Sequence, residues 1–142
     1  MILFLDFDGV LHPIYNRRTS TDFSNLPRLE DWLRFNKNIE IVISSSWREV
    51  MDIDVLKHIF AKDLRDRVIG KCPILPAKTE PLFWRHAEIV AWITQENYTG
   101  KWIALDDMEN AFPADCSQLV LCDQEIGIDD EVINELTRRI KS

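Results

Sequence analysis

The chain alternates between short apolar runs and longer segments in which apolar residues recur every three or four positions. Short runs rich in branched side chains predict strands, and the longer periodic segments predict helices. We expect strands at residues 2–5, 39–44, 67–72, 101–107 and 118–123, and helices at residues 27–36, 47–62, 83–97 and 129–141. Because strands that alternate with helices form βαβ units, the pattern predicts an α/β fold with a mainly parallel sheet.

Two longer segments, residues 12–27 and 71–81, lie between the periodic runs. The first is polar and irregular, and the second contains three prolines. Loops of this length in compact domains are often functional. Arg17 and Arg18 lie in the first segment, where we expect solvated loop charges, with contact to a phosphorylated polymer as the alternative.

The length and composition are those of one globular domain. The 142 residues predict a single domain over residues 1–142. No apolar run approaches the ~18 residues of a membrane span, and the first residues lack the layout of a signal peptide. The three cysteines are an odd number without metal-binding spacing, which is typical of reduced thiols. We therefore expect a cytoplasmic protein that has no membrane segment.

The net charge of −7 restricts the partners that the whole surface can attract. An acidic protein repels the phosphate backbone of a nucleic acid. Any contact with nucleic acid would therefore need a local basic patch.

Acidic and hydroxyl side chains follow three of the expected strands. The carboxyl ends of these strands carry Asp6 and Asp8, Ser44 to Ser46, and Asp106 and Asp107. In a parallel sheet these ends form the edge where ligands bind, so we expect the side chains to converge. Carboxylates held close together repel one another unless a cation or a proton compensates. Mg²⁺ prefers carboxylates, water and phosphate oxygens, and the sequence therefore predicts a magnesium site here.

Three stretches in this order resemble a known superfamily. "FLDFDGVL" resembles the first motif of the haloacid dehalogenase (HAD) phosphohydrolases, "IVISSSW" resembles the second, and "IALDD" resembles the acidic fourth. More narrowly, "DFDGVLHP", "ISSSWRE" and the tail "CDQEIGIDDEVINEL" are similar to the HAD domains of Swiss Army Knife RNA repair proteins. The resemblance implies a three-layer α/β/α, Rossmann-like fold.

The spacing of the motifs leaves no room for a cap domain. About 40 residues separate Asp6 from Ser45, and about 40 separate Ser45 from Arg85, which is less than a typical folded domain of ~50 or more. We therefore expect a capless domain with an open site. In this superfamily an open site often goes with large substrates.

The two leading aspartates have different expected roles. A carboxylate can act as a nucleophile, and Asp6 is our candidate to form an aspartyl phosphate. Asp8 points to the same side of an extended segment and is the candidate general acid and base. The resemblance implies the same assignment. We expect Mg²⁺ to be held by Asp6, the backbone carbonyl of Asp8, and the pair Asp106 and Asp107.

Two further groups are expected to hold the phosphoryl oxygens. The family pattern favours the hydroxyl of Ser45, with Ser44 second, although serines at this place also cap helices. The family also uses a Lys or Arg near the start of a helix before the acidic pair. Arg85 fits that position better than Lys78, and its guanidinium matches phosphate geometry.

His12 and the tryptophans have a structural and a functional interpretation. His12 follows the first motif and could contact substrate or metal, but we expect it to anchor the neighbouring loop. The five tryptophans are expected to lie mostly in the core: Trp32, Trp47, Trp84, Trp92 and Trp102.

The sequence thus predicts a Mg²⁺-dependent phosphatase that acts on a phosphomonoester. The substrate is expected to be a phosphorylated nucleic-acid end or another large molecule, and the acidic charge counts against nucleic acid. The alternative is a HAD-like binding or regulatory domain with weak or no catalysis. A receiver domain is disfavoured because receivers carry their acidic pair on the first strand. The oligomeric state stays open.

Overall fold

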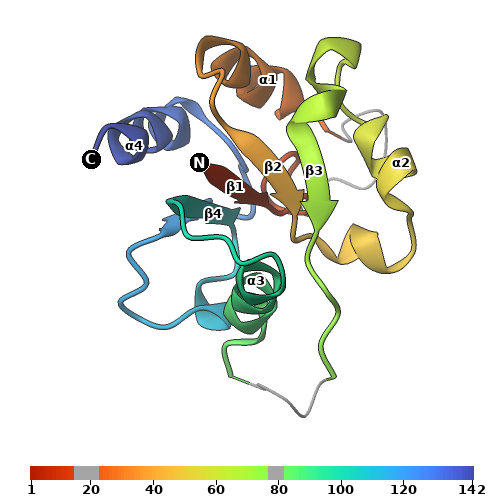
Figure 1. The fold of residues 1–142 in the computed structure, drawn as a ribbon. Coiled ribbons are helices and arrows are strands. Elements are labelled where there is room, and N and C mark those ends of the chain that lie inside the picture. The colour runs from red at the N-terminus through yellow and green to blue at the C-terminus, as the bar shows by residue number, and fades with distance from the viewer. Residues whose placement is uncertain (15–22, 77–81) are drawn as a thin grey trace.

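A computed structural model of the chain describes residues 1–14, 23–76 and 82–142. Figure 1 shows strands and helices in alternation along the chain. The strands are β1 (Ile2–Leu5), β2 (Glu40–Ile43), β3 (Val68–Lys71), β4 (Trp102–Asp106) and β5 (Leu119–Leu121). The α-helices are α1 (Leu26–Phe35), α2 (Ile53–Lys57), α3 (Trp84–Gln95) and α4 (Asp130–Lys141), and three short 3₁₀ helices are η1 (Ser46–Glu49), η2 (Lys62–Arg67) and η3 (Glu109–Ala111).

The strands form one parallel sheet in the order β3-β2-β1-β4-β5. β1 is central and pairs with β2 on one side and with β4 on the other. Leu5 pairs with both Ile43 and Leu105, so the three strands end level with one another. The prediction of an α/β fold with a mainly parallel sheet is confirmed.

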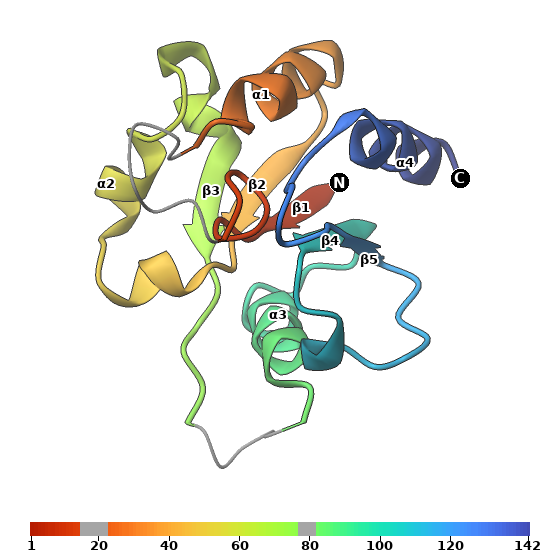
Figure 2. The ribbon, with the colours of Figure 1, turned by 180° about the vertical axis from the view of Figure 1, so that it is seen from behind.

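Helices cover both faces of the sheet and make three layers (Figures 1 and 2). Because side chains alternate along a strand, Leu3 and Leu5 face one way and Ile2 and Phe4 the other. Leu3 and Leu5 pack in a core cluster with residues of α1, α2 and α4. Ile2 and Phe4 pack in a second cluster with residues of α3 and η3. The α/β/α arrangement is therefore confirmed, and the described residues contain no cap.

The expectation of one helix at residues 47–62 is wrong, because the chain forms two short helices there and the second ends at Lys57. The chain makes the short η1 and then begins α2 at Ile53. Asp52 between them has an extended backbone (φ −69°, ψ 157°), which a helix cannot accommodate. Aspartate favours such a position because its side chain competes for backbone hydrogen bonds in a helix interior.

Two further expectations concern the tryptophans and the membrane. Trp32 and Trp92 are buried, whereas Trp84 is exposed and is an exception to the expected core position. Among the residues that the structure describes, no helix has both the length and the apolar character needed to cross a membrane.

Candidate active site

The carboxyl ends of β1, β2 and β4 bring three polar residues to one edge of the sheet. Asp6 follows β1, Ser44 follows β2, and Asp106 is the last residue of β4. Backbone bonds hold them level: the Asp6 N–H donates to the Leu105 carbonyl (3.1 Å) and the Ser44 N–H donates to the Leu5 carbonyl (3.0 Å). All three side chains are buried. The strand-end convergence expected from the sequence is therefore present.

Asp6, Asp106 and Asp107 form an acidic cluster in which one carboxylate oxygen of each lies within 4.8 Å of the others. Burial raises the pKa of Asp6 well above its usual range, and the nearby Asp106 carboxylate raises it further. Burial also raises the pKa of Asp106 to about 6, while Arg85 acts in the opposite direction. Ionising both carboxyl groups of this cluster is therefore unfavourable, and a bound cation would make it favourable.

One oxygen of Asp106 lacks a hydrogen-bond donor. Oδ1 accepts from the Met108 N–H at 3.0 Å. Oδ2 is buried and accepts no hydrogen bond from the part of the chain that the structure describes. The Arg85 guanidinium is an ion-pair partner of this oxygen at 3.5 Å, but without a hydrogen bond the oxygen keeps a free acceptor position. Together with the all-oxygen donor set, this free acceptor position means that the acidic cluster fits a divalent metal ion.

Gly9 allows Asp107 to approach the first motif. Its φ of 75° is in the left-handed region that favours glycine. A Cβ at this position would overlap the carboxylate of Asp107. The glycine of "DFDGV" therefore leaves space for one member of the acidic cluster.

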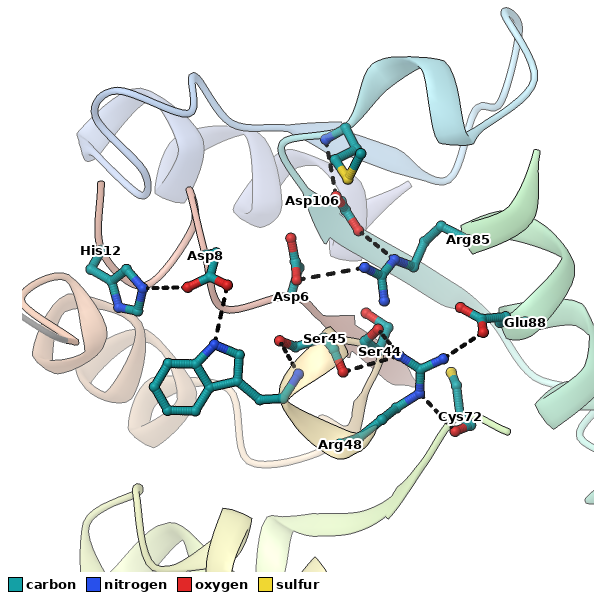
Figure 3. Close-up of polar contacts among 12 residues, drawn as sticks. Asp6, Asp8, His12, Ser44, Ser45, Arg48, Cys72, Arg85, Glu88 and Asp106 are labelled. Atoms are coloured by element: carbon teal, nitrogen blue, oxygen red, sulfur yellow. Dashed lines mark hydrogen bonds and ion pairs between the residues drawn. The ribbon is translucent and has the colours of Figure 1, made fainter. Parts of the chain in front are cut away.

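Arg85 reaches the acidic cluster from the first turn of α3 (Figure 3). Its Nη2 lies 3.9 Å from Asp6 Oδ1, and its Nε lies 3.5 Å from Asp106 Oδ2. The guanidinium is buried, with its central carbon 4.7 Å from the centre of the Trp84 ring. Among the described residues, Nε and Nη1 have no hydrogen-bond acceptor. Arg85 therefore presents N–H groups without hydrogen-bond acceptors beside the carboxylates, as an anion-binding group would.

Three of the basic residues that the sequence points to lie outside the part of the chain that the structure describes. Lys78, the second candidate for the phosphoryl-binding cation, lies outside the described residues, and so do Arg17 and Arg18. Arg85 is at the site, and its role there stays a prediction.

Asp8 does not join the acidic cluster through its side chain. Its Oδ1 accepts from His12 Nε2 at 2.7 Å, and its Oδ2 accepts from the Trp47 indole N–H at 3.1 Å. Figure 3 shows the carboxylate between His12 and Asp6. The Asp8 side chain is about half exposed, whereas His12 is buried. Asp8 is thus the solvent-facing member of the pair of leading aspartates.

Both candidate serines are buried at the end of β2. The Ser45 hydroxyl oxygen accepts from the Trp47 backbone N–H at 3.2 Å and so caps η1. Helix capping is the alternative role that the sequence analysis gives to these serines. The hydroxyl proton of Ser45 still has freedom to donate elsewhere, so the choice between Ser44 and Ser45 stays open.

Arg48 and Glu88 are buried residues of this region that sequence reasoning missed. Arg48 Nη2 lies 2.6 Å from Glu88 Oε2, and the pair joins η1 to α3 (Figure 3). Arg48 Nη1 also donates to the carbonyls of Ser44 (2.8 Å) and Ser45 (3.0 Å). Its Nε donates to the Cys72 carbonyl (2.9 Å) at the end of β3. One side chain therefore ties together the segments that carry the serines and Arg85.

A signal for this pair is present in the sequence. Arg85, Glu88, Ile89 and Trp92 recur at helical spacing and make the buried face of α3. Two charged residues on an apolar face indicate buried charges that need partners. The identity of the partner, Arg48, could not be found from spacing alone.

The fold and the acidic edge together define a HAD-like α/β domain. A family model for the HAD domain in Swiss Army Knife RNA repair proteins matches residues 2–133. The chain belongs to this family. No curated protein and no solved structure matches the chain.

Proposed function

We propose that the chain is a Mg²⁺-dependent phosphomonoesterase that works through an aspartyl phosphate on Asp6. One observation carries the proposal: the buried Arg85 guanidinium lies beside Asp6 and Asp106, and two of its N–H-bearing nitrogens have no hydrogen-bond acceptor among the described residues. A buried cation with free N–H groups beside a candidate nucleophile suits a phosphoryl group. Membership of the HAD family supports the same chemistry.

The first chemical step would transfer the phosphoryl group to the protein. An ionised oxygen of Asp6 attacks phosphorus while the bond between phosphorus and the leaving oxygen breaks. Asp8, as the carboxylic acid, gives its proton to the leaving oxygen. The products are the alcohol, an aspartyl phosphate on Asp6 and the Asp8 carboxylate.

The second step would return the protein to its starting state. Water attacks phosphorus, and the Asp8 carboxylate takes one of the protons of that water. The bond between phosphorus and Asp6 breaks, which releases inorganic phosphate and regenerates the Asp6 carboxylate. Asp8 ends as the carboxylic acid, so atoms and charges balance over the cycle.

The acidic cluster supports the proposal that the reaction depends on a metal ion. Burial and repulsion favour a protonated Asp6, which is a poor nucleophile. Arg85 favours the ionised form. Mg²⁺ held by Asp6, Asp106, Asp107 and the Asp8 backbone carbonyl would favour that form further and neutralise charge on the phosphoryl oxygens. Ser45, with Ser44 as the alternative, and Arg85 would hold those oxygens.

The substrate proposal rests on the family and on the open site. The family description names RNA repair proteins, which favours a phosphorylated nucleic-acid end. The described residues contain no cap that would restrict a large substrate. The net charge of −7 opposes a long nucleic-acid contact, so we propose that recognition is confined to the phosphorylated end.

A phosphate-release assay tests the activity. p-Nitrophenyl phosphate is incubated with the wild-type chain and with Asp6→Asn, with Mg²⁺ and with a chelator. We expect turnover with Mg²⁺ for the wild type and for the matched surface control Asp115→Asn, and no turnover for Asp6→Asn or with the chelator. A second screen compares 3′- and 5′-phosphorylated RNA and DNA, nucleotides and phosphopeptides. Full activity in Asp6→Asn would refute the proposed mechanism, and Mg²⁺ binding without turnover on any substrate would favour a binding or regulatory domain.

A further inference from the structure

We propose that His12 and Trp47 are positioning residues that act through Asp8. Their N–H groups hold the Asp8 carboxylate in the orientation in which it exchanges protons with the leaving oxygen and with water. This inference rests on the proposed function. It adds roles for two side chains that sequence reasoning assigned to loop anchoring and to the core.

The first argument is that each oxygen of Asp8 has its own donor. His12 Nε2 lies 2.7 Å from Oδ1, and Trp47 Nε1 lies 3.1 Å from Oδ2. Two donors on opposite oxygens prevent rotation of the carboxylate about its Cβ–Cγ bond. A carboxylate has about four acceptor positions, so each oxygen keeps one that is free for the substrate or for water. The carboxylate therefore has a fixed orientation, and each of its oxygens can still accept a hydrogen bond from the substrate or from water.

The second argument is that the backbone fixes the tautomer of His12. The Phe23 backbone N–H donates to His12 Nδ1 at 3.1 Å. Nδ1 must then be an acceptor without a proton, which leaves the ring proton of a neutral imidazole on Nε2. The N–H that faces Asp8 is therefore set by a hydrogen bond on the far side of the ring.

The third argument is that aromatic packing holds the rings of His12 and Trp47 in place. The His12 ring centre lies 5.3 Å from that of Phe23 and 6.1 Å from that of Trp47. The Trp47 ring packs against Phe7 (5.7 Å) and Phe23 (5.1 Å). The Gly9 N–H donates to the His12 carbonyl (2.9 Å) and closes the loop between Asp8 and His12. Neither donor can turn away from Asp8 without disrupting this aromatic cluster.

A purely structural role for the two rings predicts a different kinetic result. Loss of packing alone would lower the activity on every substrate by a similar factor. Loss of a positioned acid would matter most when the leaving oxygen needs a proton, as in an alkyl phosphate. A nitrophenolate leaving group hardly needs one. The comparison of two leaving groups therefore separates the two interpretations.

The kinetic experiment uses substitutions that keep a ring in place. Trp47→Phe and His12→Phe remove the donors, and His12→Gln returns an N–H near the position of Nε2. We expect kcat on an alkyl phosphate to fall by about 10–100-fold in the two Phe variants, within the ~10²–10⁴-fold total of acid–base catalysis, with KM nearly unchanged. The single-turnover release of p-nitrophenolate should fall by less than about 3-fold, and His12→Gln should recover a large part of kcat. Matched controls are Trp102→Phe, at the opposite end of β4, and His58→Gln, which is remote from Asp8.

A double-substitution test shows whether the effect passes through Asp8. In the Asp8→Asn background, Trp47→Phe and His12→Phe should cause no further loss on the alkyl phosphate. Equal losses on both substrates, or a further loss in the Asp8→Asn background, would overturn the proposal while leaving the phosphatase function intact.

A measurement without turnover separates this proposal from the proposed function. In ¹H–¹⁵N spectra we expect the Trp47 indole resonance, identified by its absence in Trp47→Phe, to shift in Asp8→Asn, while that of Trp102 stays in place. The His12 nitrogens should show an unprotonated Nδ1. An unchanged Trp47 resonance would overturn the positioning role. A wild-type chain that shows the shift but hydrolyses neither substrate would overturn the proposed function, and with it the role of both residues in catalysis.

Discussion

The guanidinium of Arg48 lies 2.6 Å from the carboxylate of Glu88, and both side chains are almost fully buried. Arg48 belongs to η1, directly after the candidate serines, and Glu88 lies one turn after Arg85 in α3. The pair therefore connects the two elements that carry the expected phosphoryl-binding groups. We expect the pair to hold these elements together and to take no part in the chemistry.

Removal of Arg48 should destabilise the fold strongly. Arg48→Met leaves the Glu88 carboxylate buried and uncompensated, which typically costs about 3–5 kcal/mol of unfolding free energy. Urea unfolding measures the loss. The control is Arg34→Met, because the Arg34–Asp63 pair is on the surface and should contribute little. Equal effects of the two substitutions would show that the buried pair is not a main source of stability.

Asp6→Asn should abolish turnover and stabilise the metal-free protein. The substitution removes the nucleophile, so no phosphoenzyme should form. It also replaces a carboxyl group whose ionised form is disfavoured by burial and by the Asp106 carboxylate, which raise its pKa. We expect the melting temperature without metal to rise by about 2–5 °C, which corresponds to roughly 1 kcal/mol. A lower melting temperature would contradict the conclusion that an ionised Asp6 destabilises the folded protein.

Asp8→Asn should trap the phosphorylated protein. Asp6 can still attack a substrate with a good leaving group, but the water of the second step loses its base. An aspartyl phosphate should therefore accumulate on Asp6 and be detected by intact-protein mass spectrometry after acid quenching. An amide also offers an NH₂ group to one of the two donors that face Asp8, so a small loss of stability is expected. Phosphate found on residue 8 in the wild type would show that the two roles are reversed.

Metal binding should stabilise the protein more at neutral than at acidic pH. The pKa of Asp6 and that of Asp106 are raised in the folded state, so the folded protein keeps protons that the unfolded chain has released. Without metal, the unfolding free energy should fall as the pH rises from about 4 through about 6. Mg²⁺ competes with these protons, so millimolar Mg²⁺ should raise the melting temperature clearly at about pH 7.5 and little at about pH 5. Asp107→Asn should reduce the effect, whereas an equal shift at both pH values would contradict it.

Ser45→Ala should weaken phosphoryl transfer more than Ser44→Ala. A hydrogen bond to a charged group contributes about 1.5–3 kcal/mol, so kcat/KM should fall by roughly 10–150-fold. Ser45→Thr keeps the hydroxyl and should retain most of the activity. Loss of the η1 cap also costs about 1 kcal/mol of stability, which thermal unfolding measures separately. A larger kinetic effect of Ser44→Ala would assign the role to Ser44.

Much of the fold could be predicted because its patterns are local. The period of apolar residues separates strands from helices without knowledge of distant contacts. The polar residues after three strands indicated one edge of a parallel sheet, where Asp6 and Asp106 do meet. The family motifs could also be recognised in the sequence, because each is a short continuous stretch at the end of a strand.

The remaining features depend on contacts between residues far apart in the chain. The sequence could not show that Arg48 faces Glu88, because spacing does not specify how η1 packs on α3. It also could not show that Trp47 and Asp8 share a hydrogen bond, because spacing does not specify how η1 packs on the segment after β1. The pKa of Asp106 likewise depends on burial, which only the packed sheet and helices create. The sequence by itself determined the strands, three of the four α-helices and the chemical groups at the edge of the sheet. The tertiary structure decided which groups are buried and which donors face each carboxylate, because burial and hydrogen-bond geometry exist only after the layers have packed.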